Sequence, residues 1–154
     1  MNDSLDEMTP AGICKVSVQK LQSFGMTSRK ADYIKDFAQK VLDGEFDLDA
    51  VEHMTDEEAI AALSSLKGIG VWTAEMILLF CLQRPNILSF RDLAIRRGMT
   101  IVYHQKDIDR KFFEIIRSRL SPCCSVASLY FWVAAGEAKE KAPAGSTKKQ
   151  EVKK

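Results

Sequence analysis

A tight Gly-x-Gly turn between two helical segments constrains this chain more than any other feature of its sequence. Thr55 and Glu58 have the spacing of a capping box, in which hydroxyl and carboxylate each bond a backbone N–H of the first helical turn. This box opens a helix that we expect to run to about Leu66. A strongly apolar helix follows the turn, from Val71 to about Leu82. The sequence therefore predicts a hairpin of two packed helices.

The turn itself, Lys-Gly-Ile-Gly, has a physical interpretation that needs no comparison. Gly68 and Gly70 permit positive φ and a close backbone approach, and Ile69 between them can fill the core. The N–H groups that open the second helix then point outward with the helix dipole behind them, which favours a phosphate oxygen. Thr73 can add a hydroxyl donor. The alternative is an ordinary turn between two packed helices.

The rest of the chain also predicts helices, so we expect an all-α fold. The expected helices outside the hairpin are Val16 to Phe24; one capped by Thr27 or Ser28 and stopped at Gly44; a short turn capped by Asp47; Asp92 to Arg97, ending at Gly98; one capped by Asp107 or Asp109 and reaching Leu120; and one that starts at Ser121-Pro122 and ends near Gly136. We expect residues 1–136 to form one helical domain and residues 137–154 to form a disordered basic tail.

The charges of the chain are unevenly distributed, although the net charge is only +1. Residues 1–66 contain 13 acidic and 6 basic side chains, whereas residues 87–119 contain 8 Lys or Arg and 4 acids. Such asymmetry is typical of a protein that presents one face to a polyanion. A solvated charged surface is the alternative.

Composition also limits the compartment and the cofactors. No apolar run approaches the roughly 18 residues of a membrane span, and the acidic first residues are unlike a targeting peptide. We therefore expect an intracellular protein, in cytoplasm and nucleoid or in the nucleus. The cysteines, Cys14, Cys81, Cys123 and Cys124, lack metal-binding spacing, which argues against zinc or an iron–sulfur cluster and for reduced thiols. We expect Cys81 to be buried.

Several motifs in order resemble the HhH-GPD superfamily of DNA glycosylases, and most of all its 3-methyladenine DNA glycosylase II branch. The similarity covers about residues 10 to 136. It is carried by LQSFGMTSRKADYI, LSSLKGIGVWTAEMILLF, a following proline, FRDLAIRRGM and SVASLYFW. The resemblance implies the helical domain of that family. Relative to the family this chain begins late, so we expect the family's first helices to be missing.

The resemblance also implies roles for individual residues. Asp92 matches the family's catalytic aspartate, and no cofactor is required for its chemistry. The implied base-binding residues are Trp72, Trp132 and Met76; the implied phosphate contacts are Gly68, Gly70 and Thr73; and the implied ligands of a structural Na⁺ or K⁺ are the backbone carbonyls of Ser64, Leu66 and Ile69.

Each of these residues also has a simpler interpretation. Asp92 can serve only as the cap of the helix that follows it, and Trp132 can be an ordinary core residue. The basic residues Arg91, Arg96 and Arg97 can form a solvated face.

The expected function is that of a monofunctional DNA glycosylase that excises flipped alkylated purines such as 3-methyladenine. Trp72 occupies the position of the lysine nucleophile in bifunctional relatives, so we expect no lyase activity. The expected partner is double-stranded DNA with alkylated bases, bound by a monomer that contacts no membrane. Two alternatives stay open: a DNA-binding remnant without catalysis, and a helical fragment that needs a partner chain.

Overall fold

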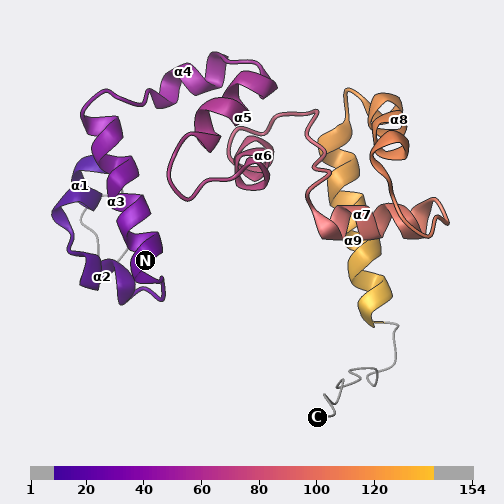
Figure 1. Cartoon of the computed structure of the whole chain (residues 1–154), viewed down its shortest axis with the longest axis horizontal. Coiled ribbons are helices and arrows are strands. Elements are labelled where there is room, and N and C mark those ends of the chain that lie inside the picture. Colours follow the sequence, from indigo (N-terminus) through magenta and orange to yellow (C-terminus); the bar gives the residue numbers. More distant parts are fainter. Residues whose placement is uncertain (1–8, 141–154) are drawn as a thin grey trace, which may run out of the picture. The chain divides into compact units, whose positions relative to one another are not determined.

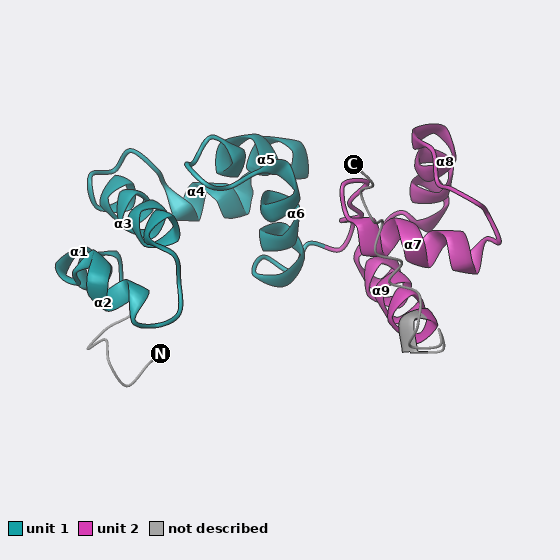
Figure 2. Cartoon of the chain, turned by 60° about the horizontal axis from the view of Figure 1, so that its bottom comes forward, with its two compact units in different colours: residues 1–84 teal, residues 85–154 magenta. Residues whose placement is uncertain are grey.

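The computed structural model describes residues 9–140, and within that range all regular secondary structure is helical, as predicted (Figure 1). The helices are α1 (Pro10–Lys15), α2 (Val18–Gln22), α3 (Ser28–Leu42), α4 (Leu48–His53), α5 (Asp56–Ser64), α6 (Val71–Phe80), α7 (Leu93–Val102), α8 (Arg110–Leu120) and α9 (Cys124–Glu140). They divide into two compact units, residues 1–84 with α1 to α6 and residues 85–154 with α7 to α9 (Figure 2). No helix in the described range is long and apolar enough to cross a membrane.

Side-chain caps start most of these helices where the sequence predicted. Thr27 caps α3, Asp47 caps α4 and Asp109 caps α8 through bonds to first-turn N–H groups. The capping box is present: Thr55 N donates to Glu58 Oε2 at 2.9 Å, and Glu58 N donates to Thr55 Oγ1 at 3.3 Å. The hydrogen bonds that the Thr55 backbone N–H and the Thr55 hydroxyl donate to the Glu58 carboxylate lower the pKa of Glu58. Because such bonds join residues two or three apart, local sequence is sufficient to predict them.

In the first unit, α1 and α2 pack on α3, and α5 packs on α6. Arg84 joins the end of α6 to the turn between α4 and α5. Its Nη2 donates to the carbonyl oxygens of Glu52 and Met54 at 2.8 and 2.9 Å, and its Nη1 lies 3.5 Å from Asp56 Oδ1.

In the second unit, two buried serines of α9 hold the segment that lies just before α7. Ser128 Oγ donates to the Ile87 carbonyl at 2.8 Å, and Ile87 N donates to Ser125 Oγ at 3.0 Å. The core beneath these bonds consists of Leu88, Ile95, Met99, Ile108, Phe113, Ile116, Cys124 and Phe131. Because each buried hydroxyl has a hydrogen-bond partner, the polar side chains do not destabilise this core.

Gly98 lies inside α7 rather than at its end, so the prediction of a helix that stops there is wrong. In this unit α7 and α9 cross (Figure 1), and a Cβ at Gly98 would collide with the backbone carbonyl of Phe131. Glycine therefore allows the two helices to approach closely. A contact between residues this far apart in the sequence gives no local signal, and the glycine resembled a helix terminator.

Other helix boundaries also differ from the predictions. The helix predicted for residues 16–24 is shorter, because Ser17 caps α2 and Gln22 is its last residue. The preceding helix α1 was not predicted. The last helix begins at Cys124, after a cis Ser121–Pro122 bond, not at the proline. It continues to Glu140, past the predicted tail boundary, and the remainder of that tail lies outside the described residues.

The four cysteines are free. Cys124 is buried, and burial raises the pKa of its thiol. Cys81 is exposed, so the expectation that it is buried is wrong. It is the residue just after α6 ends at Phe80, beyond the helical face that contacts the core.

We predict that Gly98→Ala destabilises the second unit, because the added methyl group meets backbone atoms that cannot rotate away. The expected loss in free energy of unfolding is about 1–3 kcal/mol, the cost of inserting a methyl group into packed structure. Urea denaturation followed by circular dichroism measures it. Gly136→Ala is the control, because nothing lies within 4 Å of a Cβ there. Equal midpoints for Gly98→Ala and wild type would contradict the prediction.

Candidate active site and hairpin

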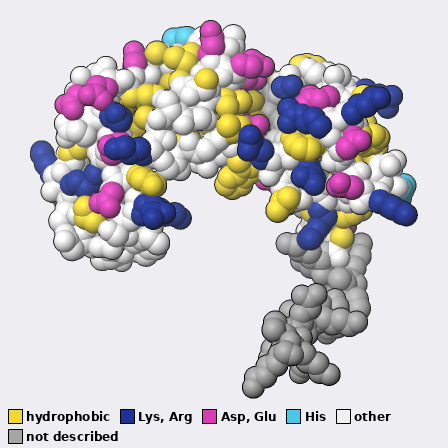
Figure 3. All heavy atoms as spheres, viewed as in Figure 1, with side chains coloured by type: hydrophobic (Ala, Val, Ile, Leu, Met, Phe, Trp, Pro, Cys, Tyr) yellow, Lys and Arg dark blue, Asp and Glu magenta, His cyan; other side chains and the backbone are white. Residues whose placement is uncertain are grey.

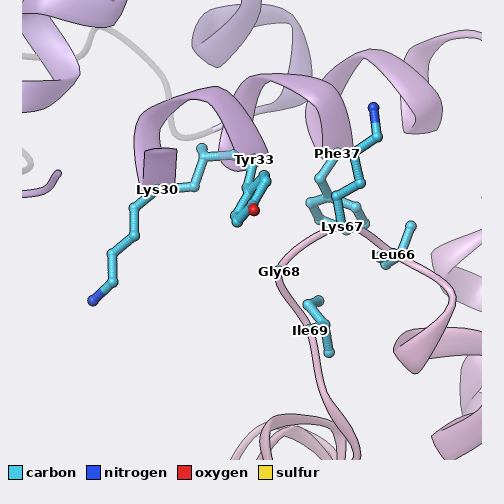
Figure 4. A pocket seen from close by; sticks show the side chains of 8 residues that line it. Lys30, Tyr33, Phe37, Leu66, Lys67, Gly68 and Ile69 are labelled. Atoms are coloured by element: carbon cyan, nitrogen blue, oxygen red, sulfur yellow. The ribbon is translucent and has the colours of Figure 1, made fainter. Parts of the chain in front are cut away.

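The hairpin, Leu66–Gly70, is held against α3 by one glycine. Gly68 has φ +83°, and a Cβ at this position would collide with the ring of Tyr33. Figure 4 shows the Tyr33 side chain of α3 facing the hairpin backbone, beside a largely apolar cavity. Ile69 N donates to the Leu66 carbonyl at 3.2 Å and closes the turn. Both the backbone conformation and the packing therefore require glycine at residue 68.

Gly70 differs from Gly68 in its backbone conformation. Its φ is −93°, a value that any residue can adopt, so of the two glycines only Gly68 uses the positive φ that glycine permits. It is the N-cap of α6 and supplies no side-chain hydrogen bond, and nothing lies within 4 Å of a Cβ built there. The start of α6 is therefore sterically open. The positive end of its dipole is positioned to attract an anion, with half-buried Thr73 in the same turn.

One face of α6 carries the predicted base-binding residues of the first unit. Trp72 is 46% exposed and Met76 is half-buried, and the spacing of four places both on the same side of the helix. Phe80, 58% exposed, continues this line by another turn. Sequence analysis did not select Phe80, although the same spacing of four was the available signal. We call these three residues the α6 aromatic face.

The lysine of the hairpin is held by an ion pair. Lys67 Nζ lies 3.1 Å from Asp36 Oδ1 of α3, although the Lys67 side chain is 67% exposed. Exposed pairs of this kind stabilise a fold by about 0–1 kcal/mol. The ion pair therefore contributes little to stability, but it directs the Lys67 side chain toward α3.

The predicted cation ligands lie where α5 ends. Ser64 is the last residue of α5, and the final carbonyls of a helix lack partners within that helix. The Leu66 carbonyl accepts one bond, from Ile69 N, and keeps a second lone pair. The Ser64 hydroxyl oxygen is buried and has no hydrogen-bond partner within the described part of the chain. Unsatisfied oxygens at the negative end of a helix dipole fit a monovalent cation.

In the second unit, Asp92 is the N-cap of α7. Its Oδ1 accepts from Ala94 N at 2.8 Å, from Ile95 N at 2.9 Å and from Trp132 Nε1 at 3.2 Å. The residue is only 7% exposed. Three N–H donors and the positive end of the α7 dipole stabilise negative charge on this carboxylate.

Trp132 of α9 is therefore more than a core residue. It is half-buried against the core of the second unit, and its indole N–H is directed at Asp92. This bond fixes the orientation of both the ring and the carboxylate. Asp92 does cap α7, and the Trp132 bond gives its carboxylate a further contact that capping does not need.

The structure brings the predicted residues together in two groups. Gly68, Gly70 and Thr73 lie at the hairpin and the start of α6, together with the predicted cation ligands and the α6 aromatic face. Asp92 and Trp132 lie in the second unit, 40 residues apart in sequence and joined by one hydrogen bond.

Comparison with known proteins identifies the family. The model of the HhH-GPD superfamily of base excision DNA repair proteins matches residues 2–122. This chain belongs to the HhH-GPD superfamily. The match includes the hairpin and Asp92, so both groups of predicted residues contain positions within the matched segment.

Among HhH-GPD proteins, this chain is similar to several named for alkylated-base repair. It is 31% identical to DNA-3-methyladenine glycosylase 1 of Schizosaccharomyces pombe, over 80% of this chain and 55% of the relative. The crystal structure of a DNA-3-methyladenine glycosidase from Bacillus halodurans is 34% identical, with TM-score 0.74 over 86% of this chain and 62% of that one.

A second solved relative is bound to DNA. The S. pombe 3-methyladenine DNA glycosylase in complex with abasic DNA is 31% identical, with TM-score 0.68 over 80% of this chain and 61% of that one. This chain spans about half the length of the curated relatives, 43% and 55% of two of them.

We predict that Gly68→Ala destabilises the first unit, whereas Gly70→Ala leaves its stability nearly unchanged. The first substitution combines a positive φ with a collision against Tyr33, which costs about 1–3 kcal/mol. The second meets open space at an ordinary φ. Urea denaturation of both variants measures the difference. Equal losses at the two positions would contradict this account of the hairpin.

Proposed function

We propose that this protein is a monofunctional DNA glycosylase that hydrolyses the N-glycosidic bond of alkylated purines such as 3-methyladenine. The observation that carries the proposal is Asp92, a buried carboxylate that three N–H donors and the α7 dipole hold in place. Family membership and the names of the relatives support it. The base in the names of these relatives, 3-methyladenine, is a cationic purine while it is attached to DNA, and it is therefore already a good leaving group.

In the proposed reaction, the bond between C1′ and the purine nitrogen breaks, and its electron pair leaves with the base. The cationic base thereby becomes neutral. Positive charge builds on the sugar, and the Asp92 carboxylate stabilises it electrostatically, more strongly because burial excludes water. A water oxygen then bonds to C1′ and loses one proton to Asp92 or to solvent, which leaves an abasic site.

We assign Trp132 a positioning role through its bond to Asp92, and we assign the α6 aromatic face the stacking of the extruded base. A cationic purine is attracted to an electron-rich indole by about 0.5–2 kcal/mol. The face of Trp72 is large, and 46% of the residue is exposed in the described structure. This assignment adds Phe80 to the residues that the sequence selected.

We propose that the hairpin binds a DNA phosphate independently of base sequence, through the N–H groups at the start of α6 and through Thr73. The open position at Gly70 supports this role, because a phosphate can approach the backbone there. The carbonyls of Ser64, Leu66 and Ile69 would hold Na⁺ or K⁺, whose positive charge would stabilise the bound phosphate. The chemistry requires no other cofactor, and the cysteine spacing argues against an iron–sulfur cluster.

Replacement of Asp92 by Asn tests the catalytic role. Asn is as good an N-cap as Asp, so the fold should be retained, but the negative charge is lost. We expect the single-turnover rate of methylpurine release from alkylated duplex to fall by about a hundredfold to a thousandfold, with DNA binding retained.

Asp109→Asn is the matched control. Asp109 also caps a helix of the second unit, and its Oδ1 accepts a hydrogen bond from Phe112 N at 2.7 Å. We expect its replacement by Asn to leave excision unchanged. Wild-type excision by Asp92→Asn would reduce Asp92 to a cap. A wild-type chain that binds DNA and excises nothing would support the alternative of a non-catalytic binding module.

We predict that no Schiff base forms between this protein and DNA. Trp72 has no amine, and Lys67, the lysine of the hairpin, is paired with Asp36. Borohydride treatment on a damaged duplex should trap no covalent adduct, and strand cleavage should stay at the level without protein. An adduct that is lost on Lys67→Ala would show that the enzyme is bifunctional.

A further inference from the structure

A hollow on the surface of the second unit is lined by three arginines and one aromatic ring. The lining residues are Phe90, Arg91, Arg96 and Arg110. They come from the segment before α7, from α7 itself and from the first turn of α8. The sequence grouped Arg91 and Arg96 with Arg97, but Arg97 does not line the hollow, and Arg110 takes its place.

Phe90 organises the basic groups. The guanidinium carbons of Arg96 and Arg110 lie 5.1 and 5.0 Å from the centre of its ring. The ring itself packs edge-on against buried Phe113, with centroids 5.1 Å apart and planes at 77°. A guanidinium that stacks by its face keeps its N–H groups at the edge for an acceptor. The core of the unit therefore holds the two arginines in place.

Two acids accompany these arginines without cancelling their charge. Asp107 Oδ1 lies 3.5 Å from Arg96 Nη2, and Glu114 Oε1 lies 2.8 Å from Arg110 Nε. Arg91 is exposed and forms no ion pair among residues 9–140. Asp107 is 76% exposed, so its contribution to the pair is screened by water. Three positive and two negative charges leave the hollow basic, and Figure 3 shows dark-blue side chains gathered on this unit with acids among them.

We propose that this arginine hollow binds a phosphate of the DNA backbone, at a point separate from the hairpin. The inference rests on the proposed function, because it adds a second contact to the same DNA. Arginine edges suit the paired oxygens of a phosphodiester. The hollow is open and its lining residues are partly exposed, which suits a strand that passes along the surface better than a free phosphate ion that must be enclosed.

The test compares Arg91→Gln and Arg110→Gln with Arg119→Gln, all in the full chain. Arg119 is an exposed arginine near the other end of α8, outside the hollow, so it controls for the loss of one charge. Affinity for duplex DNA is measured over a range of salt concentrations. Each hollow variant should reduce the slope of log affinity against log salt by about one. The Arg119→Gln slope should equal that of wild type.

Three results would overturn the inference, and only the second of them would also overturn the proposed function. In the first result, Arg91→Gln and Arg110→Gln have the same slope of log affinity against log salt as Arg119→Gln, while Gly70→Val at the hairpin weakens binding. This would contradict DNA binding by the hollow but not the proposed function. No DNA binding by any chain would remove both. In the third result, inorganic phosphate shifts the arginine side-chain NMR signals, but Arg91→Gln and Arg110→Gln bind DNA with unchanged affinity. This would indicate that the hollow binds a free anion and not DNA.

Discussion

Three N–H groups converge on one oxygen of Asp92, and the organisation of the second unit depends on this convergence. Two of them open α7, and the third is the indole N–H of Trp132 on α9. The same bonds therefore start a helix, connect it to another helix and stabilise a negative charge in a buried position. A carboxylate at 7% exposure would be costly without these donors. Structural capping and the proposed catalysis use one arrangement and do not compete.

The two hairpin glycines differ in their surroundings, one being packed and the other open. Gly68 faces inward, where its positive φ and the ring of Tyr33 exclude any side chain. Gly70 faces open space at the start of α6, where a side chain would be tolerated by the fold and would obstruct an anion. The first glycine thus secures the turn to α3, and the second keeps the end of the helix dipole accessible. Together the two glycines leave the backbone at the start of α6 accessible while the turn before it packs against α3.

Aromatic rings also have distinct roles in the two units. Phe90 rests on the core and presents its ring to two guanidinium groups, which orders basic side chains at a surface hollow. On α6, Trp72, Met76 and Phe80 line one side of a helix with large exposed apolar area. Exposed aromatic residues on one side of a helix are unusual on a polar surface, which is why we proposed this face for stacking. A repair protein needs both properties, charge for the strand and a stacking surface for the base.

The sequence alone determined the helical class, the family, most helix starts and the position of the hairpin. Caps such as Thr55 with Glu58, and turns such as residues 66–70, depend on neighbours within a few residues, so local patterns reveal them. Tertiary structure decided the rest. The Phe131 backbone leaves no room for a side chain at Gly98, Trp132 contacts Asp92 across 40 residues, and Arg110 rather than Arg97 lies beside Phe90. These contacts depend on how distant segments pack, and a residue's own neighbours in sequence do not encode which side chain will meet it.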